Sequence, residues 1–475
     1  MLFNSLIFIG FTTAVFLIYP RLRLRGQNLF LLAASYVFYG YWDWRFSFLL
    51  LTSTVVDFFV GRKLQSAGSR RNRKLLLIFS LAVNLGILGF FKYFNFFIES
   101  AAYVLSSVGF VPHVPVLRVL LPIGISFYTF KTMTYTIDIY RGKMKPTDSF
   151  VDYALFTSFF PQILAGPIER ASNLLPQISA PRLIMREKVL AGMGLVLLGS
   201  FKKVAIADTL APMVGKIFDA PESMTGGQLW TGLYAYTFQI YGDFSGYTDI
   251  ARGISLILGF ETMVNFNSPY LSRNITEFWR RWHISLSTWF RDYLYIPLGG
   301  NRLGPVRTYA NLFITMLLCG LWHGAAWTFV LWGAIHGTGL LVHRAMLGGR
   351  KVDLSWRPTA RGWATDIAGA LLTFHFVALA WVLFRAPTPD SALVYFQGLF
   401  RFQPVTGFSF SVLFAGGLLI ALDIVQSCFA SQTWLTDRWN HKFLRYAAAQ
   451  LLLISVIAAA IAHVGTITPF IYFQF

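Results

Sequence analysis

The sequence has few charged residues, few cysteines and no recognisable soluble domain. Charged residues make up 13% of the chain, about half of the usual share in soluble domains. Hydrophobic residues make up 55%, and mean hydropathy is +0.55. Apolar stretches recur from one end of the chain to the other, and no low-complexity linker separates them. Because these stretches are continuous rather than alternating, they predict membrane-spanning helices and exclude a barrel.

The expected fold class is an all-α polytopic membrane protein with roughly ten to twelve spans, at about 20 residues for each crossing. In the middle of the chain, at 119–345, Gly, Pro and polar residues interrupt the apolar stretches. Non-helical backbone at membrane depth is tolerated only where it is buried in protein or lines a wet cavity. We therefore expect one domain, 1–475, in which short re-entrant helices of the middle region surround a funnel. The flanking regions, 1–118 and 346–475, should form its wall.

Cysteine is nearly absent, and this excludes a disulfide framework or a CxxC metal site. The two cysteines, Cys319 and Cys428, both lie in apolar stretches. Cys319 precedes His323 by four residues, so a Cys–His nucleophile pair is conceivable. A free cysteine in such a stretch is more commonly a small packing residue.

Acidic residues are scarce as well, since 40 Lys and Arg face 21 Asp and Glu, for a net charge of +19. Basic clusters follow alternate apolar stretches, at 21–25, 62–74 and 141–145, whereas 41–44 and 98–116 contain no Lys or Arg. The positive-inside rule explains this pattern better than a nucleic-acid partner does. It predicts a periplasmic N-terminus and cytoplasmic basic loops. The first apolar stretch precedes its charges, so we expect a span rather than a cleaved signal peptide.

One histidine lies far from any charge. His323 belongs to the sequence Leu321–Gly324, inside a run from Thr308 to His343 without Asp, Glu, Lys or Arg. As a single helix this run would be about 54 Å long, against a hydrocarbon core of about 30 Å. It must therefore break, and the glycines on either side of His323 make a break there cheapest. An ionisable group at this depth is a candidate functional residue, and a histidine bonded between helices is the alternative.

The stretch 277–294 is dense in cations and aromatic residues, and it predicts an amphipathic helix at the membrane surface. Asn274 or Thr276 could cap this helix. On a continuous helix, one stripe would carry Trp279, Trp282, His283, Leu286, Trp289 and Phe290, and another would carry Arg280, Ser287 and Arg291. The helix could be an interfacial anchor. It could also line a vestibule whose arginines bind a phosphorylated donor such as coenzyme A.

Other titratable residues have simpler explanations. Asp243 and Asp249 are expected to pair with cations or to cap broken helices rather than to act as acid and base. His336 and His343 are two helical turns apart, but no carboxylate or cysteine cluster accompanies them, so no metal site is expected. Two further histidines in apolar stretches are expected to be satisfied core residues: His375 and His463.

A buried histidine suits one kind of chemistry well. Acyl transfer to a hydroxyl needs a base that takes the alcohol proton as the oxygen attacks the acyl carbon. Burial disfavours a charged imidazole, so His323 should be neutral and able to act as this base. His283 could help to position or polarise a reactant.

These motifs resemble those of the membrane-bound O-acyltransferase family, and its bacterial polysaccharide-acetylation branch fits best. The membrane protein of teichoic-acid D-alanylation is a more distant relative. The resemblance covers the whole chain, and its strongest segments are Leu121–Phe127 (LPIGISF), Phe160–Pro167 (FPQILAGP), Phe244–Asp249 (FSGYTD), Glu277–Gly300 (EFWRRWHISLSTWFRDYLYIPLGG), Gly320–Gly324 (GLWHG) and Pro469–Phe475 (PFIYFQF).

The resemblance implies a ring of helices around a thinned centre, where a cytoplasmic funnel meets an outer cavity near His323. His323 matches the family's essential histidine, and His283 matches the second histidine in its RWH motif. Five residues are then expected to line the donor side: Arg280, Arg281, Trp282, Trp322 and Arg291.

The function implied by the resemblance is an exopolysaccharide O-acetyltransferase of the bacterial inner membrane. It would take acetyl from cytoplasmic acetyl-CoA, without a permanently bound cofactor, and deliver it to a periplasmic SGNH-hydrolase-like partner or to the polymer. Alginate is the leading substrate and cellulose the second, and a polysaccharide synthase or secretion complex is the expected assembly.

Two alternatives remain open at the level of sequence. One is a non-enzymatic transporter or scaffold for an acetyl carrier, and the other is an acyltransferase with a long-chain donor. The bulky Trp322, Trp327 and Trp332 favour a short acyl pocket, although tryptophan also serves as ordinary packing.

Overall fold

The computed structural model describes residues 1–110, 120–348, 362–401, 407–428, 450–459 and 470–473, and over these residues it is helical without strands. The all-α fold class is thereby confirmed. The chain divides into two compact units, Met1–Val189 with Ile254–Thr262, and Leu190–Gly253 with Met263–Phe475. The three regions expected within one domain, divided near residues 118 and 345, stay a prediction.

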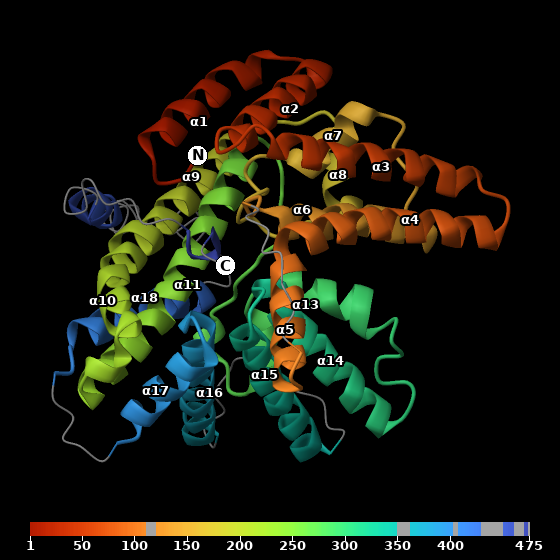
Figure 1. The fold of residues 1–475 in the computed structure, drawn as a ribbon. Helices are drawn as coiled ribbons and strands as arrows, with labels where there is room; N and C mark the ends of the chain where they lie inside the picture. The colour runs from red at the N-terminus through yellow and green to blue at the C-terminus, as the bar shows by residue number, and fades with distance from the viewer. Residues whose placement is uncertain (111–119, 349–361, 402–406, 429–449, 460–469, 474–475) are drawn as a thin grey trace. The chain divides into compact units, whose positions relative to one another are not determined.

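The first unit contains the N-terminal helices, and α4 continues through a π-helical segment into α5 (Figure 1). Its elements are α1 (Leu6–Ile18), η1 (Tyr19–Arg21), α2 (Leu24–Gly40), α3 (Phe46–Ser66), α4 (Arg70–Leu88), η2 (Gly89–Tyr93), α5 (Phe94–Ser107), α6 (Ile125–Tyr140), α7 (Phe150–Ser158) and α8 (Ala171–Ser179).

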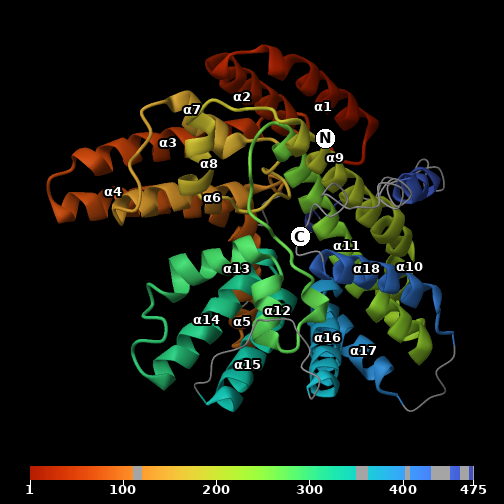
Figure 2. The same ribbon diagram turned by 180° about the vertical axis from the view of Figure 1, so that it is seen from behind.

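Helices α3, α4 and α6 pack side by side around a buried polar cluster (Figures 1 and 2). The Asp57 carboxylate accepts hydrogen bonds from Ser80 Oγ at 2.6 Å and from Asn84 Nδ2 at 2.9 Å. Thr132 Oγ1 on α6 donates to Asn84 Oδ1 at 3.1 Å. Apolar contact between helices gains little over contact with lipid tails, so such interhelical hydrogen bonds help to determine which helices pair.

The second unit contains the remaining helices and both candidate histidines. Its elements are α9 (Arg186–Ser200, which begins in the first unit), η3 (Phe201–Ala207), α10 (Asp208–Asp219), η4 (Pro221–Ser223), α11 (Gly226–Ile257, which ends in the first unit), η5 (Pro269–Leu271), α12 (Ile275–Arg281), α13 (Ile284–Phe290), η6 (Arg291–Tyr295), α14 (Pro305–His323), α15 (Trp327–Leu347), α16 (Trp363–Arg385), α17 (Pro389–Leu399), α18 (Ser411–Cys428) and η7 (Ile471–Phe473).

The long uncharged run breaks where the sequence predicted. Helix α14 ends at His323, Gly324 adopts an extended conformation, and α15 begins at Trp327 and returns beside α14 (Figure 2). Glycines allow the two helices to approach closely, because a Cβ on Gly320 would run into the Phe329 carbonyl. The break places His323 at the carboxyl end of a helix that is packed against its own continuation.

Glycines also bring α9 and α11 together. A Cβ on Gly199 would lie 2.5 Å from the Gly246 carbonyl oxygen, and a Cβ on Gly253 would lie 2.5 Å from the Gly192 carbonyl oxygen. Real Cβ atoms do not approach that closely, so each position needs glycine. Small residues at helix contacts are typical of packing in membranes. The close approach sets η3, which continues α9, against the middle of α11.

Three helical segments in the described residues are long and apolar enough to cross a membrane, by length and composition alone: Arg70–Ser107, Arg186–Asp219 and Trp363–Arg385. Shorter apolar helices lie at Leu6–Arg21, Ser411–Val425 and Gln450–Ala459. The predicted total of ten to twelve spans stays a prediction.

Candidate active site

The second unit brings His323 and His283 together. Their ring centroids are 6.3 Å apart, and the side chains are buried, with 2% and 0% of their surface exposed. This spacing is longer than a direct hydrogen bond between two imidazoles allows.

Large aromatic side chains enclose His323. The centroids of Trp322, Trp332 and Phe384 lie 5.2, 5.1 and 5.2 Å from its ring. All three residues are buried. Trp327 is 54% exposed instead, so the expectation that it helps to shape a pocket at His323 is wrong. Trp327 is the first residue of α15.

His283 has an unusual backbone conformation. Its φ of 43° and ψ of 54° are left-handed, and among the described residues other than glycine only Ser268 shares a positive φ. The predicted continuous helix over 277–294 is therefore wrong: α12 ends at Arg281, α13 begins at Ile284, and η6 follows. The aromatic residues do not form a single stripe, because the turn at His283 gives α13 a different axis from α12. Such strain persists only where neighbouring contacts enforce it, and it is typical of functional sites.

Asn265 supplies those contacts. Its carbonyl oxygen accepts the Ile284 N–H at 2.9 Å. Its Oδ1 accepts the N–H and the hydroxyl of Ser285, at 3.2 and 2.9 Å. The backbone on both sides of the turn is thus tied to the loop after α11, since Asn267 N also donates to the Arg281 carbonyl at 2.9 Å. This fastening holds the His283 ring toward His323.

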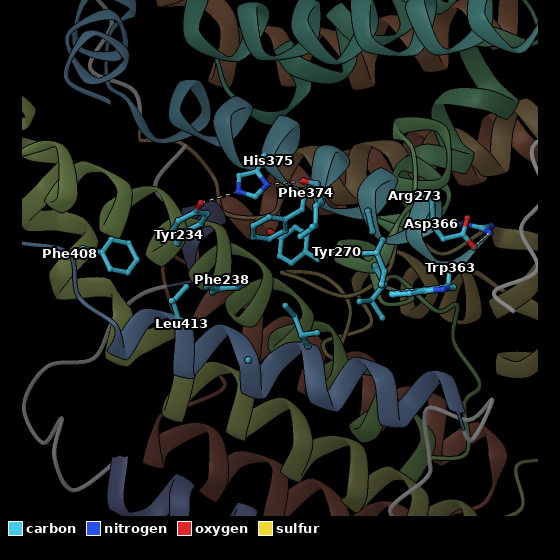
Figure 3. A pocket seen from close by; sticks show the side chains of 16 residues that line it. Tyr234, Phe238, Tyr270, Arg273, Trp363, Asp366, Phe374, His375, Phe408 and Leu413 are labelled. Carbon is cyan, nitrogen blue, oxygen red and sulfur yellow. Dashed lines mark hydrogen bonds and ion pairs between the residues drawn. The ribbon is translucent and has the colours of Figure 1, made fainter. Parts of the chain in front are cut away.

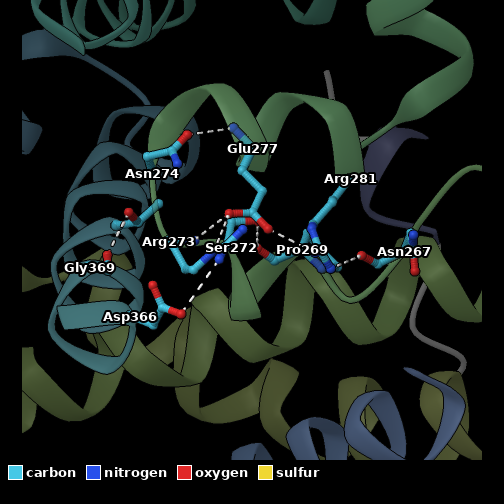
Figure 4. Close-up of polar contacts among 10 residues, drawn as sticks. Asn267, Pro269, Ser272, Arg273, Asn274, Glu277, Arg281, Asp366 and Gly369 are labelled. Carbon is cyan, nitrogen blue, oxygen red and sulfur yellow. Dashed lines mark hydrogen bonds and ion pairs between the residues drawn. The ribbon is translucent and has the colours of Figure 1, made fainter. Parts of the chain in front are cut away.

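A buried cluster of ion pairs ties α12 to the residue before its N-terminal cap (Figure 4). The fully buried Glu277 carboxylate accepts from Arg281 Nη2 at 2.8 Å and from Arg273 Nε at 3.1 Å. Asn274 Oδ1 accepts the Glu277 N–H at 2.9 Å, which confirms Asn274 as the helix cap. Sequence analysis missed Glu277, although its spacing of four residues from an arginine on each side is a recognisable signal.

Asp243 and Asp249 pair with cations, as predicted. Asp243 Oδ1 lies 2.7 Å from Lys203 Nζ, and Asp249 Oδ2 lies 2.9 Å from Lys202 Nζ. Lys203 also contacts Asp208, at 2.8 Å. Both lysines belong to η3, and π-helical turns of this kind are frequent at functional sites.

The end of the chain inserts beside the histidines. Asp243 Oδ2 accepts the Ile471 N–H at 2.7 Å, and the next residue, Tyr472, has its ring 5.6 Å from His323 and 6.4 Å from His283. The same tyrosine ring packs on Phe244 at 4.5 Å. The sequence indicated this segment only through its resemblance to the family, and nothing in local periodicity could place it at His323.

Comparisons with known proteins identify the family. The family model for membrane-bound O-acyltransferases matches residues 142–383. A "Probable alginate O-acetylase" of Pseudomonas putida is 39% identical over the full length of both chains. The chain belongs to the membrane-bound O-acyltransferase family. The family resemblance is confirmed, and the protein is an acyltransferase of membrane type.

Two further relatives show how widely this acyltransferase architecture is used. A "Probable alginate O-acetylase" of Pseudomonas aeruginosa is 45% identical across 85% of this chain and 75% of the relative. A "Peptidoglycan O-acetyltransferase" of Helicobacter pylori is 38% identical across 84% of this chain and 80% of the relative.

The residues expected on the donor side of this acyltransferase are not equivalent. Arg280 and Arg291 are exposed, and Arg291 pairs with Asp292 at 2.7 Å. Arg281 is buried against Glu277, so its charge is engaged inside the protein. Trp282 and Trp322 are buried near His283. Their roles in donor binding stay predictions, and the two exposed arginines are the ones available to a phosphate.

The remaining histidines are separate from this pair. His343 Nδ1 contacts Thr276 Oγ1 at 2.8 Å, and His375 contacts Tyr234, so both are satisfied. His336 is fully buried among aromatic rings, and its nitrogens have no hydrogen-bond partner within the part of the chain that the structure describes. Cys319 is buried, as expected for a packing residue. The prediction for His463 lies outside the described residues.

Proposed function

We propose that this acyltransferase moves acetyl from cytoplasmic acetyl-CoA across the bacterial inner membrane onto an exopolysaccharide. The observation that supports the proposal is the pair of buried imidazoles, with ring centroids 6.3 Å apart, beside the ring of Tyr472. Relatives named as alginate O-acetylases make alginate the first substrate to test, ahead of cellulose. The acetyl group reaches the polymer directly or through a periplasmic SGNH-hydrolase-like partner, within a polysaccharide synthase or secretion complex.

In the proposed chemistry, neutral His323 accepts the proton of the acceptor hydroxyl as its oxygen attacks the acetyl carbonyl carbon. The new C–O bond forms, the C–S bond of the thioester breaks, and the proton passes to the leaving thiolate. His283 lies on the other side of the reacting atoms, where a ring N–H can donate to the carbonyl oxygen as it gains charge. General acid–base assistance of this kind contributes about 10²- to 10⁴-fold to rate.

The aromatic enclosure of His323 favours a short acyl group. Three aromatic rings have centroids 5.1–5.2 Å from that of the imidazole: Trp322, Trp332 and Phe384. A long acyl chain would have to displace these rings, whereas an acetyl group is small enough to avoid this. Interiors are close-packed, and displacing buried aromatic rings costs several kcal/mol. The proposal therefore ranks acetyl ahead of a long-chain donor.

The test is acetyl transfer from radiolabelled acetyl-CoA to alginate in membranes of a producing strain that expresses each variant. His323→Ala is expected to lose at least about 100-fold of the ester signal while its abundance in the membrane stays the same. His336→Phe is the matched control, since it removes a buried imidazole that makes no hydrogen bond in the described structure. Retained ester in His323→Ala would refute the assignment. Radiolabelled acetyl ester in peptidoglycan instead of alginate would make peptidoglycan the substrate.

A further inference from the structure

An apolar groove of about 830 Å³ lies on the second unit, between α11, α16, α18 and η5 (Figure 3). This volume is in the range of sites that hold organic ligands. Its walls are aromatic and aliphatic, and they include Phe238, Tyr270, Leu371, Phe374, Leu413 and Ile420. The two candidate histidines are not among its lining residues. The groove is therefore separate from the site described above.

The groove has a polar group at each end. Trp363, Arg273 and Asp366 lie at one end, and the pair Tyr234–His375 lies at the other (Figure 3). His375 Nδ1 donates to the Leu371 carbonyl at 2.8 Å, so its Nε2 accepts from the Tyr234 hydroxyl at 3.0 Å. Both ring nitrogens of His375 therefore have a hydrogen-bond partner at this end of the groove.

The length of the groove matches one leaflet of a bilayer. It follows α16, a helix long and apolar enough to span a membrane, from Trp363 at its first residue to His375. That distance is about 18 Å along a helix, close to half of a hydrocarbon core of about 30 Å. Trp363 is 59% exposed at the start of the span, where tryptophan typically lies at headgroup depth.

The end of the groove at Trp363 presents one cation and one anion. Arg273 Nη1 and Asp366 Oδ2 are 3.5 Å apart, a looser pair than Arg273 with Glu277 at 3.1 Å. Their side chains are 15% and 33% exposed. Glu277 lies between Arg273 and Arg281 and is fully buried, so it does not reach a ligand (Figure 4). A headgroup that carries both a phosphate and an ammonium complements this arrangement, whereas a purely anionic headgroup would face Asp366.

We propose that this groove binds a membrane phospholipid with an amino headgroup. One acyl chain lies along α16, the phosphate contacts Arg273, and the ammonium contacts Asp366. Lipid tails are as apolar as the groove, so burial of the chain alone provides little selectivity. The headgroup contacts and the shape of the groove supply it.

The bound lipid would also support the reaction centre. Tyr270 lines the groove, and its ring stacks on Trp282 at 6.0 Å, next to His283 in sequence. Its hydroxyl donates to the Thr237 carbonyl at 2.6 Å, which fixes the ring between groove and loop. A lipid acyl chain packed against the membrane-facing side of Tyr270 would complete the packing around the strained turn at His283.

The experiment measures lipid that stays with the full-length protein after purification in mild detergent and exchange into nanodiscs. The nanodiscs contain equal amounts of phosphatidylethanolamine and phosphatidylglycerol, and native mass spectrometry identifies the retained lipid. Two variants address the site: Asp366→Asn removes the anion, and Gly417→Leu fills the groove. A Cβ at Gly417 meets no atom within 4 Å, so the fold should tolerate the change. Leu418→Phe, at the next position of α18 and outside the lining, is the control.

We expect about one retained phosphatidylethanolamine in the wild type and in Leu418→Phe. Asp366→Asn should reduce it about fivefold, the size of one partly exposed ionic contact, and Gly417→Leu should reduce it further. A phospholipid with brominated acyl chains should quench part of the tryptophan fluorescence of the wild type. The quenched part should be the emission that Trp363→Phe lacks. The proposal is wrong if the wild type retains phosphatidylglycerol as well as phosphatidylethanolamine, or retains only detergent. It is also wrong if Asp366→Asn, shown to be folded by its thermal midpoint, retains as much phosphatidylethanolamine as the wild type.

Discussion

At the scale of single residues, the site depends on a histidine in a conformation that most residues avoid. The left-handed region costs an ordinary residue roughly 1–2 kcal/mol, and His283 occupies it inside the protein, next to an equally buried His323. The Asn265 contacts overcome this cost. The backbone and the imidazole of His283 therefore have separate roles, which substitutions can distinguish.

We predict that His283→Asn and His283→Leu differ in stability but not in activity. Asparagine tolerates the left-handed region, so its thermal midpoint should stay near that of the wild type, whereas leucine should lose about 1–2 kcal/mol. Both variants lack the imidazole and should lose at least about 100-fold of the acetylation rate. Thermal unfolding and transfer from labelled acetyl-CoA measure the two effects. An active His283→Asn variant would remove His283 from the mechanism.

Tyr472 offers a second test at this scale. Tyr472→Phe keeps the ring, which packs on Phe244 and lies 5.6 Å from the His323 ring, but removes its hydroxyl. We expect an unchanged thermal midpoint and about tenfold slower acetylation, the size of one lost hydrogen bond to a polar reactant. Tyr472→Leu should lower both quantities. If Tyr472→Phe is as active as the wild type, the tyrosine has only a packing role.

At the scale of elements, the sequence predicted some features and missed others for physical reasons. The break after His323 was predictable, because length alone forbids one helix from 308 to 343 and glycine marks the weak point. The break at His283 was not, since no glycine or proline lies there and Asn265 enforces it from another segment. The insertion of Tyr472 beside α14 depends on contacts between residues far apart in sequence, which helical periodicity does not record.

The contact between Asp243 and the C-terminal segment gives a prediction at this scale. Asp243→Asn keeps an oxygen for the Ile471 N–H, and Asp243→Ala removes it. Both changes remove the carboxylate that pairs with Lys203 at 2.7 Å and keep the contact between Lys203 and Asp208, and breaking a buried pair typically costs about 3–5 kcal/mol.

The two variants should therefore be similarly destabilised but unequally active. We expect Asp243→Asn to acetylate several-fold faster than Asp243→Ala, with rates normalised to folded protein by size-exclusion chromatography. Lys203→Met provides the comparison in which the Asp243 oxygen for Ile471 remains. Equal rates in the two Asp243 variants would mean that this hydrogen bond does not position the segment.

At the scale of the whole molecule, the charge distribution predicts orientation. The net charge of +19 is concentrated in alternate loops, and Lys and Arg are retained on the cytoplasmic side during insertion. The loop between α2 and α3 has the exposed Trp42, and the loop between α3 and α4 has the exposed Gly68 amid basic residues. We predict that helix α3 crosses the membrane between them, and these two loops should then lie on opposite sides of the membrane.

Cysteine labelling tests this orientation in intact cells whose outer membrane has been made permeable. A membrane-impermeant maleimide should modify Trp42→Cys at once, and it should modify Gly68→Cys only after the inner membrane is opened. The unsubstituted protein is the control, because it measures any labelling of the two native cysteines, Cys319 and Cys428. The opposite pattern would place the N-terminus in the cytoplasm. It would also contradict the proposed direction of acetyl transfer, because that proposal depends on the same topology.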